Sequence, residues 1–554
     1  MGKTPMDKNG QAKKPASMVT VVAASAAGTA FEWYDFFLFV PLANIMAKTF
    51  FTGLDPTSAY IFALGAFAVG FAFRPIGALI FGRIGDRIGR KATFLATMSL
   101  MGVSTFAVGL LPSFSQAGIV APLLFVLLRI LQGLALGGEW GGAAIYIVEH
   151  VHKDRRGISA SWLGGSAAFG LAGALLAVLI ARAAVGVEAF EAWGWRLPFL
   201  FSLALLAISV WIRLKLHESP MFQKLKDEGA RSERPYYDSF GNWASLKTVL
   251  ISLFAIMIAQ GAVWYAVFFY TSTFMERTLK VDPATVNEVM LIIVALSVPS
   301  YVFFGWLSDR IGRKVVMVSG MILFAALTFP GFHLLTKFAN PALAEASASA
   351  QVVVVADPAD CSFQFDPVGK TQFRSSCDIA KSSLAAAGVS YANQAAPAGA
   401  PAVIKIGDRT RPAIDGKGLD AKALTAAKAS FAKALNADLA AAGYPAKADP
   451  ARTDKVKMVL LLMGFVIGAC ALYGPQAAAL VELFPTKIRY TAMSLPYHIG
   501  TGWVGGFLPT TAFAIVAATG DIYAGLWYPF VFTVIAIVTS LLFLPETRGR
   551  SLED

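Results

Sequence analysis

The chain contains one basic hexapeptide twice. The first copy is Asp86-Arg87-Ile88-Gly89-Arg90-Lys91, and the second is Asp309-Arg310-Ile311-Gly312-Arg313-Lys314. Each copy lies between two long apolar runs. The copies are about 220 residues apart, which is far more than the period of a solenoid repeat. We therefore expect a chain built from two related halves, each holding several apolar segments.

The apolar runs predict helices that cross a membrane. Hydrophobic residues make up 56% of the 554 residues, and charged residues only 15%. A backbone in hydrocarbon must satisfy its own hydrogen bonds, so only helices and closed barrels cross a bilayer, and these runs are solidly apolar where barrel strands would alternate. We expect an all-α membrane protein with about twelve transmembrane helices in two six-helix bundles. The predicted spans lie near 19–45, 60–82, 92–112, 119–149, 158–182, 196–214, 247–275, 288–307, 315–337, 455–481, 491–518 and 523–544.

A second pair of motifs locates an insert. Glu149 precedes Arg156 by seven residues and Glu482 precedes Arg489 by seven, but these two motifs are about 330 residues apart instead of about 220. About 110 residues are therefore inserted in the second half, where Ala, Pro, Lys and Asp interrupt the apolar pattern. The predicted parts are a tail at 1–18, an N-terminal bundle at 19–214, a linker at 215–246, helices of the C-terminal bundle at 247–337, the insert at 338–454, further helices of that bundle at 455–544 and a tail at 545–554.

Basic residues predict how the chain is oriented. Lys and Arg gather in the loops at one end of the predicted helices, and basic loops stay on the cytoplasmic side. We expect both termini, both hexapeptides and the linker to be cytoplasmic and the insert to be periplasmic. The formal charge of +12 then belongs to these loops and does not indicate nucleic-acid binding. The first apolar run has no small-residue cleavage pattern, which favours a retained helix over a signal peptide.

Two of the three cysteines, Cys361 and Cys377, lie in the insert. Outside the cytoplasm, two cysteines about 16 residues apart with no accompanying histidine favour a disulfide, so we predict no metal site. Two unpaired thiols in a loop are the alternative. The stretch at 351–355 predicts a strand, and the stretch at 421–442 predicts an amphipathic helix.

Several strings resemble a known family. The stretches at 82–91 and 305–314 resemble the loop motif of the major facilitator superfamily. The strings that resemble its metabolite:proton symporter branch, which includes ketoglutarate, shikimate, citrate and proline-betaine permeases, are Phe31-Glu32-Trp33-Tyr34-Asp35-Phe36-Phe37, Arg74-Pro75, Gly137-Gly138-Glu139-Trp140-Gly141-Gly142 and Pro545-Glu546-Thr547-Arg548-Gly549. The resemblance implies a transporter of the cell inner membrane that works by alternating access and couples uptake of a small metabolite to protons. We expect a monomer with no cofactor beyond the coupling proton.

Charged residues inside the predicted spans are candidates for coupling, because a charge at bilayer depth costs roughly 2.5 to 3.5 kcal/mol. Asp35 and Arg129 are the predicted proton-coupling pair, because a carboxylate that loses its cationic partner takes up a proton more readily. The resemblance implies the same pairing, of a helix-one acid with a helix-four arginine. A structural ion pair and an arginine that reaches the interface are the alternatives. Glu32, on the same helix face as Asp35, is either a second proton site or a hydrogen-bond acceptor.

The predicted substrate site combines charge from the first half with polar and aromatic groups from the second. Arg129 and Arg74 would bind a carboxylate, and Glu139, among glycines that allow close helix approach, would bind a proton or a cationic group. Arg74 as a brace for the first helix and Glu139 as a structural group are the alternatives. A lone histidine on an apolar helix is more often a packing residue. The uncharged candidates are Tyr34, Gln260, Trp264, Tyr265, Gln476, Tyr497 and His498.

The hexapeptides also predict a conformational latch. The aspartate of each copy lies at a helix end, where it can pair with arginines or with a helix N-terminus in one state and separate in the other. The glutamate and arginine seven residues apart in each half would be neighbouring components. Basic loops that only fix orientation are the alternative. The predicted latch residues are Asp86, Arg87, Arg90, Glu149, Arg156, Asp309, Arg310, Arg313, Glu482 and Arg489.

These features favour a transporter over an enzyme. The sequence has no phosphate-binding glycine loop with a lysine, no HExxH motif and no nucleophile with a convincing base. Arginine in the cavity favours a carboxylate, and the chain ends without the coiled coil associated with osmotically regulated members of the branch. We therefore expect proton-coupled uptake of a small organic acid. A proline- or betaine-type zwitterion symporter and a non-transporting nutrient sensor that uses the insert are the alternatives.

Overall fold

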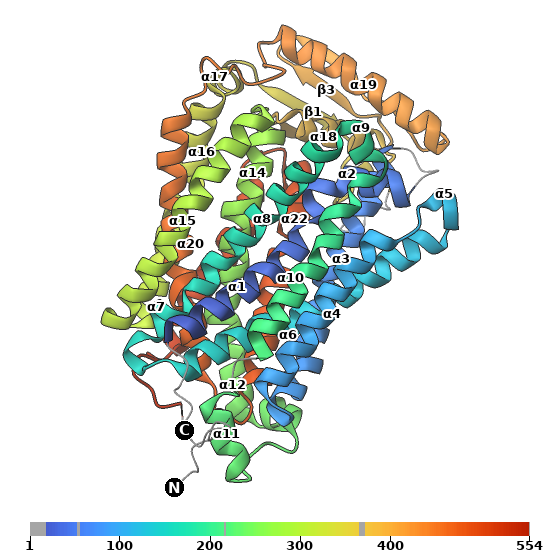
Figure 1. Cartoon of the computed structure of the whole chain (residues 1–554). Helices are drawn as coiled ribbons and strands as arrows, with labels where there is room; N and C mark the ends of the chain where they lie inside the picture. Colours follow the sequence, from blue (N-terminus) through green and yellow to red (C-terminus); the bar gives the residue numbers. More distant parts are fainter. Residues whose placement is uncertain (1–17, 52–55, 215–217, 365–371, 553–554) are drawn as a thin grey trace.

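The computed structural model describes residues 18–51, 56–214, 218–364 and 372–552. Apart from Met18, the predicted tail at 1–18 lies outside the described residues. Long helices run between two ends of the molecule, and a small unit of strands and helices covers one of them, the insert end (Figure 1). Both hexapeptides lie at the opposite end, near α7 (Arg156–Ala160) and α11 (Pro220–Asp227), and we call it the latch end.

The first half is entirely helical where it is described. Its helices alternate in direction, so short loops at each end join neighbours in sequence. The helices are α1 (Met18–Phe37), α2 (Phe39–Phe50), α3 (Pro56–Arg87), α4 (Arg90–Leu110), α5 (Phe114–Ala117), α6 (Val120–His150), α7, α8 (Trp162–Val185), α9 (Val187–Ala189) and α10 (Arg196–Leu214).

The second half repeats this plan after the linker helix α11. Two of its long helices, Trp243–Thr278 and Arg489–Thr519, are interrupted by π-helical turns and therefore carry several labels each. Such turns are frequent beside functional sites. The helices are α12 (Trp243–Ser252), α13 (Ile258–Tyr265), α14 (Thr271–Thr273), α15 (Pro283–Ile311), α16 (Arg313–Ala339), α20 (Lys455–Leu483), α21 (Arg489–His498), α22 (Leu508–Thr519) and α23 (Trp527–Phe543). The π-helical turns are η3 (Tyr237–Gly241), η4 (Leu253–Met257), η5 (Ala266–Tyr270), η6 (Phe274–Thr278) and η8 (Ile499–Gly505).

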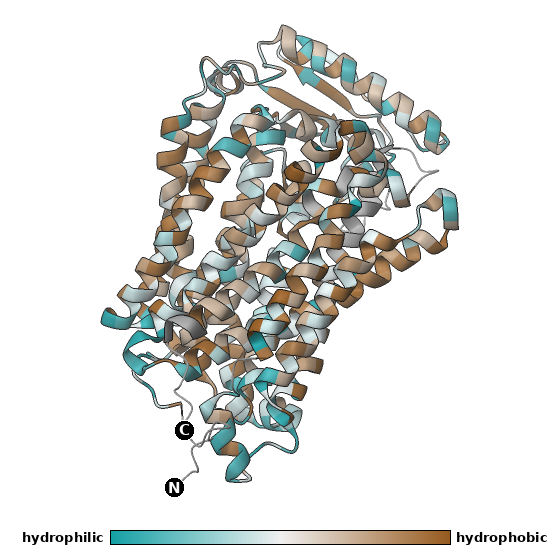
Figure 2. Ribbon diagram, viewed as in Figure 1, coloured by the Kyte–Doolittle hydropathy of each residue, from teal (hydrophilic) through white to brown (hydrophobic). Residues whose placement is uncertain are grey.

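Ten helices among the described residues are long and apolar enough to cross a membrane. Figure 2 shows apolar residues along the helices between the two ends and polar residues gathered at the ends. The predicted spans at 19–45 and 60–82 are helical but are not among the ten. The first of them is divided into α1 and α2, which meet at Leu38. The count of twelve spans stays a prediction.

Small residues bring the helices of each half close together. Gly133 of α6 faces Gly70 of α3 so closely that a Cβ on Gly133 would overlap the Gly70 carbonyl oxygen. In the second half, Gly261 of α13 and Gly500 of η8 have the same relationship. Glycines permit such backbone approaches, which replace the hydrophobic effect as the source of packing inside a bilayer.

The insert is a folded α/β unit. Its four-stranded sheet has the order β2-β1-β3-β4, with β1 parallel to β2 and the other neighbours antiparallel. Cys361 and Cys377 form a disulfide, as predicted. The predicted strand and helix are confirmed as β1 and α19. The elements are α17 (Pro341–Ser349), β1 (Val352–Ala356), α18 (Ser376–Ala387), β2 (Ala392–Ala395), β3 (Val403–Ile406), β4 (Arg409–Pro412) and α19 (Ala421–Ala441).

The insert is fastened to the second half. The backbone N–H of Tyr391 donates to the carbonyl of Gly520 over 2.7 Å, and the Asn393 amide donates to Thr519 O over 2.8 Å. On the other side, Lys280 makes two hydrogen bonds to the insert. Its ammonium donates to the carbonyl of Ala386, and its own carbonyl accepts from the N–H of Ala448. These contacts hold the insert against the ends of η6 and α22.

Candidate functional site

Arg74 lies at the boundary between the two halves. It is on α3 and is only 2% exposed. Its guanidinium carbon lies 4.5 Å from the ring centroid of Phe36 and 4.2 Å from that of Phe71. Among the described residues, no carboxylate forms an ion pair with Arg74, and its Nε and Nη2 have no hydrogen-bond partner. Its electrostatic partners are the Tyr265 and Tyr497 hydroxyls and the more distant Glu139. Buried charges are normally paired, but in the part of the chain that the structure describes this guanidinium lacks an anion in direct contact.

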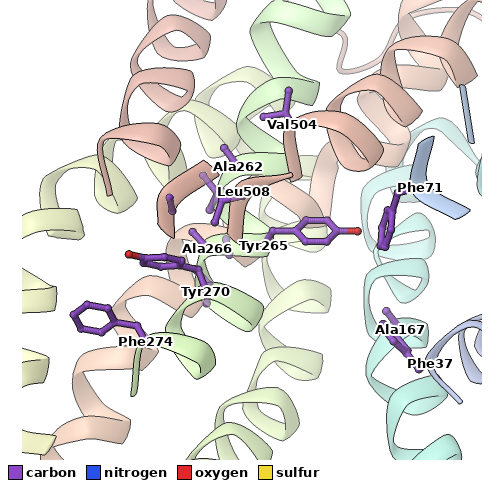
Figure 3. Packing of buried hydrophobic residues seen from close by; sticks show 14 of the residues in the cluster. Phe37, Phe71, Ala167, Ala262, Tyr265, Ala266, Tyr270, Phe274, Val504 and Leu508 are labelled. Carbon is purple, nitrogen blue, oxygen red and sulfur yellow. The ribbon is translucent and has the colours of Figure 1, made fainter. Parts of the chain in front are cut away.

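Aromatic side chains from both halves surround this position. Tyr265 of α13 points across the boundary toward Phe71 (Figure 3), with ring centroids 5.9 Å apart. Trp140 of α6 stacks on Tyr497 of α21, with centroids 3.8 Å apart. The Tyr497 hydroxyl in turn lies 3.5 Å from that of Tyr473. Aromatic faces attract cations and cover apolar surface, so the boundary suits a small ligand that carries a carboxylate and an apolar or cationic part.

Of the other predicted substrate residues, His498 lies near Arg74. Gln260 is buried on α13, and its Oε1 has no hydrogen-bond partner among the described residues. Gln476 and Trp264 bond to other residues of the second half. Gln476 donates to the Met257 sulfur over 3.4 Å. The Trp264 indole N–H donates to the Tyr301 hydroxyl over 3.0 Å.

Tyr34 does not face the boundary. Its hydroxyl donates to the carbonyl of Pro198 on α10 over 2.9 Å, and its ring lines an apolar groove between α1, α8 and α10. The structure therefore places Tyr34 in the packing of the first half.

Asp35 and Arg129 are both buried inside the first half but form no direct ion pair. Asp35 accepts a hydrogen bond from the Ser202 hydroxyl of α10 over 2.6 Å. The Arg129 guanidinium lies over the rings of Phe39 and Phe125, at 4.7 and 5.4 Å. The two groups are close enough to interact electrostatically. The predicted contact is thus replaced by a longer-range interaction in this conformation.

Glu32, Glu139 and Arg213 form a buried cluster from three helices. Arg213 Nη2 lies 3.6 Å from Glu32 Oε1, and its guanidinium stacks on Phe94 at 3.1 Å. The carboxyl groups of Glu32 and Glu139 interact electrostatically, and neither oxygen of Glu139 has a hydrogen-bond partner among the described residues. The cluster holds two acids and one permanent cation, so full ionisation would leave a net negative charge in a low-dielectric interior.

The aspartate of each hexapeptide caps the start of a helix in the other half. Asp86 of α3 accepts from the backbone N–H groups of Tyr490 and Thr491, over 3.2 and 2.8 Å, at the start of α21. Asp309 of α15 accepts from Gly157 and Ile158, over 2.9 and 2.8 Å, at the start of α7. A carboxylate at a helix N-terminus satisfies unpaired donors and complements the helix dipole. Each half therefore caps a helix of the other half.

Glutamate–arginine pairs join the halves in the same reciprocal way. Glu149 pairs with Arg489 over 2.6 Å, and Glu482 pairs with Arg156 over 3.4 Å and with Arg313 over 3.3 Å. Sequence spacing predicts Glu149 beside Arg156 and Glu482 beside Arg489. The partners are exchanged, because each glutamate reaches the arginine of the opposite half.

The arginines of each hexapeptide have different roles. Arg90 and Arg313 are buried and bond the aspartates of their own copies, at 3.1 and 2.6 Å. Arg87 and Arg310 are exposed, and Arg310 lies over the Trp306 ring at 4.1 Å. Arg87 and Arg310 therefore lie outside the closed contacts of the latch end.

Sequence patterns do not single out several residues of these sites. Arg213 is a basic residue beside the predicted linker, where basic residues fix topology, and Ser202, Trp140 and Tyr490 carry no charge that would mark them as site residues. Trp140 and Tyr490 are next to Glu139 and Arg489 in sequence, which is the signal that could have found them. Among the described residues, no group of His, Cys, Asp and Glu could hold a metal ion.

The chain matches two family models. Residues 25–355 match the model of the Major Facilitator Superfamily, and residues 429–554 match that of "Sugar (and other) transporter". Among solved structures, the fold resembles the MFS proton:xylose symporter XylE bound to 6-bromo-6-deoxy-D-glucose. That comparison has a TM-score of 0.63 and covers 97% of this chain and 98% of the other, at 15% identity.

Curated relatives are bacterial transporters. The proline/betaine transporter of Salmonella typhimurium is 36% identical over 57% of this chain, and the match covers 64% of that protein, which is less than two thirds of its length. The inner membrane metabolite transport protein YhjE of Escherichia coli is 36% identical over 56% of this chain and 71% of its own. The shikimate transporter of Escherichia coli is 33% identical over 56% of this chain and 70% of its own.

Proposed function

The chain belongs to the Major Facilitator Superfamily, and from that premise we propose that it takes up a small carboxylate-bearing metabolite together with protons. Its relatives and its fold are those of multi-pass membrane transporters and not of enzymes. The metabolite binds between the two halves, and the halves rock about it so that one side opens at a time. Protons are the coupling ion, and no other cofactor takes part.

Arg74 carries this proposal. It is a buried guanidinium at the boundary between the halves, with no carboxylate partner among the described residues. A planar guanidinium binds a carboxylate with two parallel hydrogen bonds. The substrates in the names of the proline/betaine and shikimate transporters each contain one carboxylate. Arg129 was also predicted to bind substrate, and like Arg74 it is buried, stacked on aromatic rings and without a hydrogen-bond partner among the described residues. Arg74 differs in lying near Tyr265 and Tyr497 of the second half, so we assign substrate binding to Arg74 and coupling to Arg129.

A zwitterion is the favoured substrate. The proline/betaine transporters among the relatives support it, and so do the aromatic rings around Arg74, because aromatic faces bind quaternary and secondary ammonium groups. This differs from the organic acid expected from the sequence. An organic acid remains the second candidate, and the shikimate transporter among the relatives supports it.

Coupling takes place at Asp35. In this conformation the carboxyl group accepts a hydrogen bond from Ser202 and interacts electrostatically with Arg129 without forming an ion pair. A movement of α1 relative to α6 changes the distance between the acid and the guanidinium, and with it the proton affinity of the acid. Proton uptake then depends on the conformation that the substrate stabilises.

The latch end is the cytoplasmic side in this proposal, and the insert is periplasmic, in the seven-part organisation predicted above. The capped helices and glutamate–arginine pairs hold the cytoplasmic side closed. We propose a monomer in the bacterial inner membrane. The insert is a cap on the second half and is not required for coupling. A nutrient sensor would bind substrate at the same place but would not accumulate it.

Binding measurements on the purified protein test the Arg74 site. Labelled proline and glycine betaine, with shikimate and 2-oxoglutarate as competitors, define the class of substrate. Prolinamide, which keeps the ring and lacks the carboxylate, should not compete. Arg74→Gln should weaken binding at least about tenfold, equivalent to roughly 1.4 kcal/mol, and Arg74→Lys should restore it only partly.

The matched control is Arg310→Gln, because Arg310 is an exposed arginine near a helix end of the second half. Its affinity should equal that of the wild type. Unchanged binding by the Arg74→Gln variant would remove the carboxylate site. Uptake into vesicles under an imposed pH gradient separates a transporter from a sensor.

A further inference from the structure

Tyr490 fills a pocket made of glycines. It lies near the start of α21 in the second half and is fully buried. A Cβ on Gly85 or Gly142 of the first half would overlap its ring or hydroxyl, and Gly141 is also in contact range. The Tyr490 hydroxyl donates to the carbonyl of Gly138. The glycines around Glu139 therefore admit a side chain from the other half.

Tyr490 lies beside the buried cluster of Glu32, Glu139 and Arg213. Glu139 follows Gly138 on α6, is 1% exposed, and interacts electrostatically with Tyr490, as does Glu32. Arg213 is the next-to-last residue of α10, at the end of that helix that leads into the linker, and Gly28 of α1 leaves the space that its guanidinium occupies. Tyr490 thus packs against the cluster from the second half, next to the Asp86 contact of the latch end.

The surroundings of Glu139 disfavour its ionised form. Glu139 is 1% exposed, and neither of its carboxyl oxygens has a hydrogen-bond partner among the described residues. A buried carboxylate without a donor or a cation in contact is costly, and one Arg213 cannot neutralise both acids, so one of the two carboxyl groups carries a proton. Arg213 then balances the charge of the other. The remaining ionisable groups that face the cluster are Asp35 of α1, Arg74 of α3, Tyr146 of α6 and Tyr490 of α21.

We propose that Glu32 and Glu139 share one proton as a second proton-binding site, separate from Asp35, and that Tyr490 is the cover that isolates it from the cytoplasm. The proposal deepens the proposed function, on which it rests for the direction of proton flow. Asp86 and Glu149 hold the start of α21, so opening the latch withdraws Tyr490. Water then reaches the pair, the O–H bond breaks, and the proton passes to water, leaving two carboxylates beside Arg213.

Infrared spectroscopy of the purified protein tests the shared proton without any substrate. Protonated carboxyl groups have a C=O stretch that carboxylates lack. The Asp35→Asn background removes the other proposed proton acceptor. At neutral pH the protein in that background should show such a band, and adding either Glu139→Gln or Glu32→Gln should remove it, because the remaining acid pairs with Arg213. The exposed Glu191→Gln is the control and should leave the band unchanged. A band that survives both substitutions, or its absence in the Asp35→Asn background, would overturn the shared proton.

Deuterium exchange of the same band tests the cover. In the same background the band should shift slowly after transfer to heavy water, and with Tyr490→Ala added it should shift faster. Tyr237→Ala, which removes an exposed tyrosine, should leave the rate unchanged. Equal rates with and without Tyr490→Ala would refute Tyr490 as the cover. Because this readout needs no transport, failure of the proposed function would appear separately, as absent uptake with the band intact.

Discussion

Arg489 donates to Glu149 across the boundary between the halves, with Nη1 2.6 Å from Oε1 and both side chains at most 1% exposed. The two residues are 340 positions apart in sequence. Arg156 and Glu482 form the equivalent pair at 3.4 Å. Removing one partner of a buried pair leaves an uncompensated charge, which typically costs about 3 to 5 kcal/mol. We therefore propose that these pairs hold the latch end closed.

We expect Glu149→Gln to shift the protein toward a state open at the latch end. The neutral amide cannot compensate Arg489, so the closed state alone is destabilised. Cysteine labelling of Ser494, which is buried against Gly141, should become faster in a Glu149→Gln, Ser494→Cys variant.

The control for this prediction is Glu191→Gln, which breaks the ion pair with Lys48. Both of those side chains are more than half exposed, and exposed pairs contribute about 0 to 1 kcal/mol. Labelling at position 494 should then match that of the otherwise wild-type protein. Equal labelling in the Glu149 and Glu191 variants would show that the buried pair does not hold the gate.

The insert should move with the second half. Its hydrogen bonds to Gly520 and Lys280 predict one rigid body. Spin labels at Lys433 on α19 and Val456 on α20, placed in a Cys470→Ala background, should keep their separation when the latch is opened by Glu149→Gln. The separation between labels at Lys433 and Val187 of the first half should change. The prediction would be contradicted if the Lys433–Val187 separation stayed constant while the Lys433–Val456 separation changed.

Loss of the disulfide should destabilise the insert and spare transport. The bond between Cys361 and Cys377 closes a loop with a sequence separation of 16, and a loop of that size contributes about 3 kcal/mol. We expect the Cys361→Ser, Cys377→Ser double variant to be cleaved by protease in the insert at lower temperature than the wild type. Reductant should reproduce this effect in the wild type and add nothing to the variant. Loss of uptake in the variant would show that the insert belongs to the transport pathway.

The insert should also lose stability in acid. A hydrogen bond from Arg411 holds the pKa of the Asp438 carboxyl below its usual range. A lowered pKa stabilises the folded form fully above the unfolded pKa of about 4, and this contribution disappears as the pH falls through the folded pKa. Amide exchange in β4 and α19 should accelerate in that range. Arg411→Gln should reduce the pH dependence in β4 and α19, whereas the exposed Lys405→Gln should leave it unchanged.

Much of the architecture could be predicted because it depends on local sequence patterns. The repeated hexapeptide and the two spacings between motifs located the insert, and the expectation that it lies outside the cytoplasm predicted the disulfide between Cys361 and Cys377. The helix spans followed from apolar length. Each of these inferences depends on residues that are near one another in sequence or on a simple count.

Partners across the fold could not be predicted in this way. Sequence spacing paired Glu149 with Arg156, but the reciprocal packing of the halves gives Glu149 to Arg489. Tyr34 is next to Asp35 in sequence, but that adjacency does not show that its hydroxyl bonds to Pro198 of α10. Arg213 stands where a basic residue also fixes topology, so nothing in its neighbourhood marked it as the partner of Glu32.

The central claim is that Asp35 couples protons to substrate movement, and paired transport assays on Asp35→Asn in proteoliposomes test it most directly. The wild type should accumulate labelled substrate against its gradient when the outside is made acidic, and it should exchange labelled for unlabelled substrate without a pH gradient. We predict that Asp35→Asn loses the accumulation and keeps the exchange. Accumulation by Asp35→Asn at the wild-type level would contradict the account.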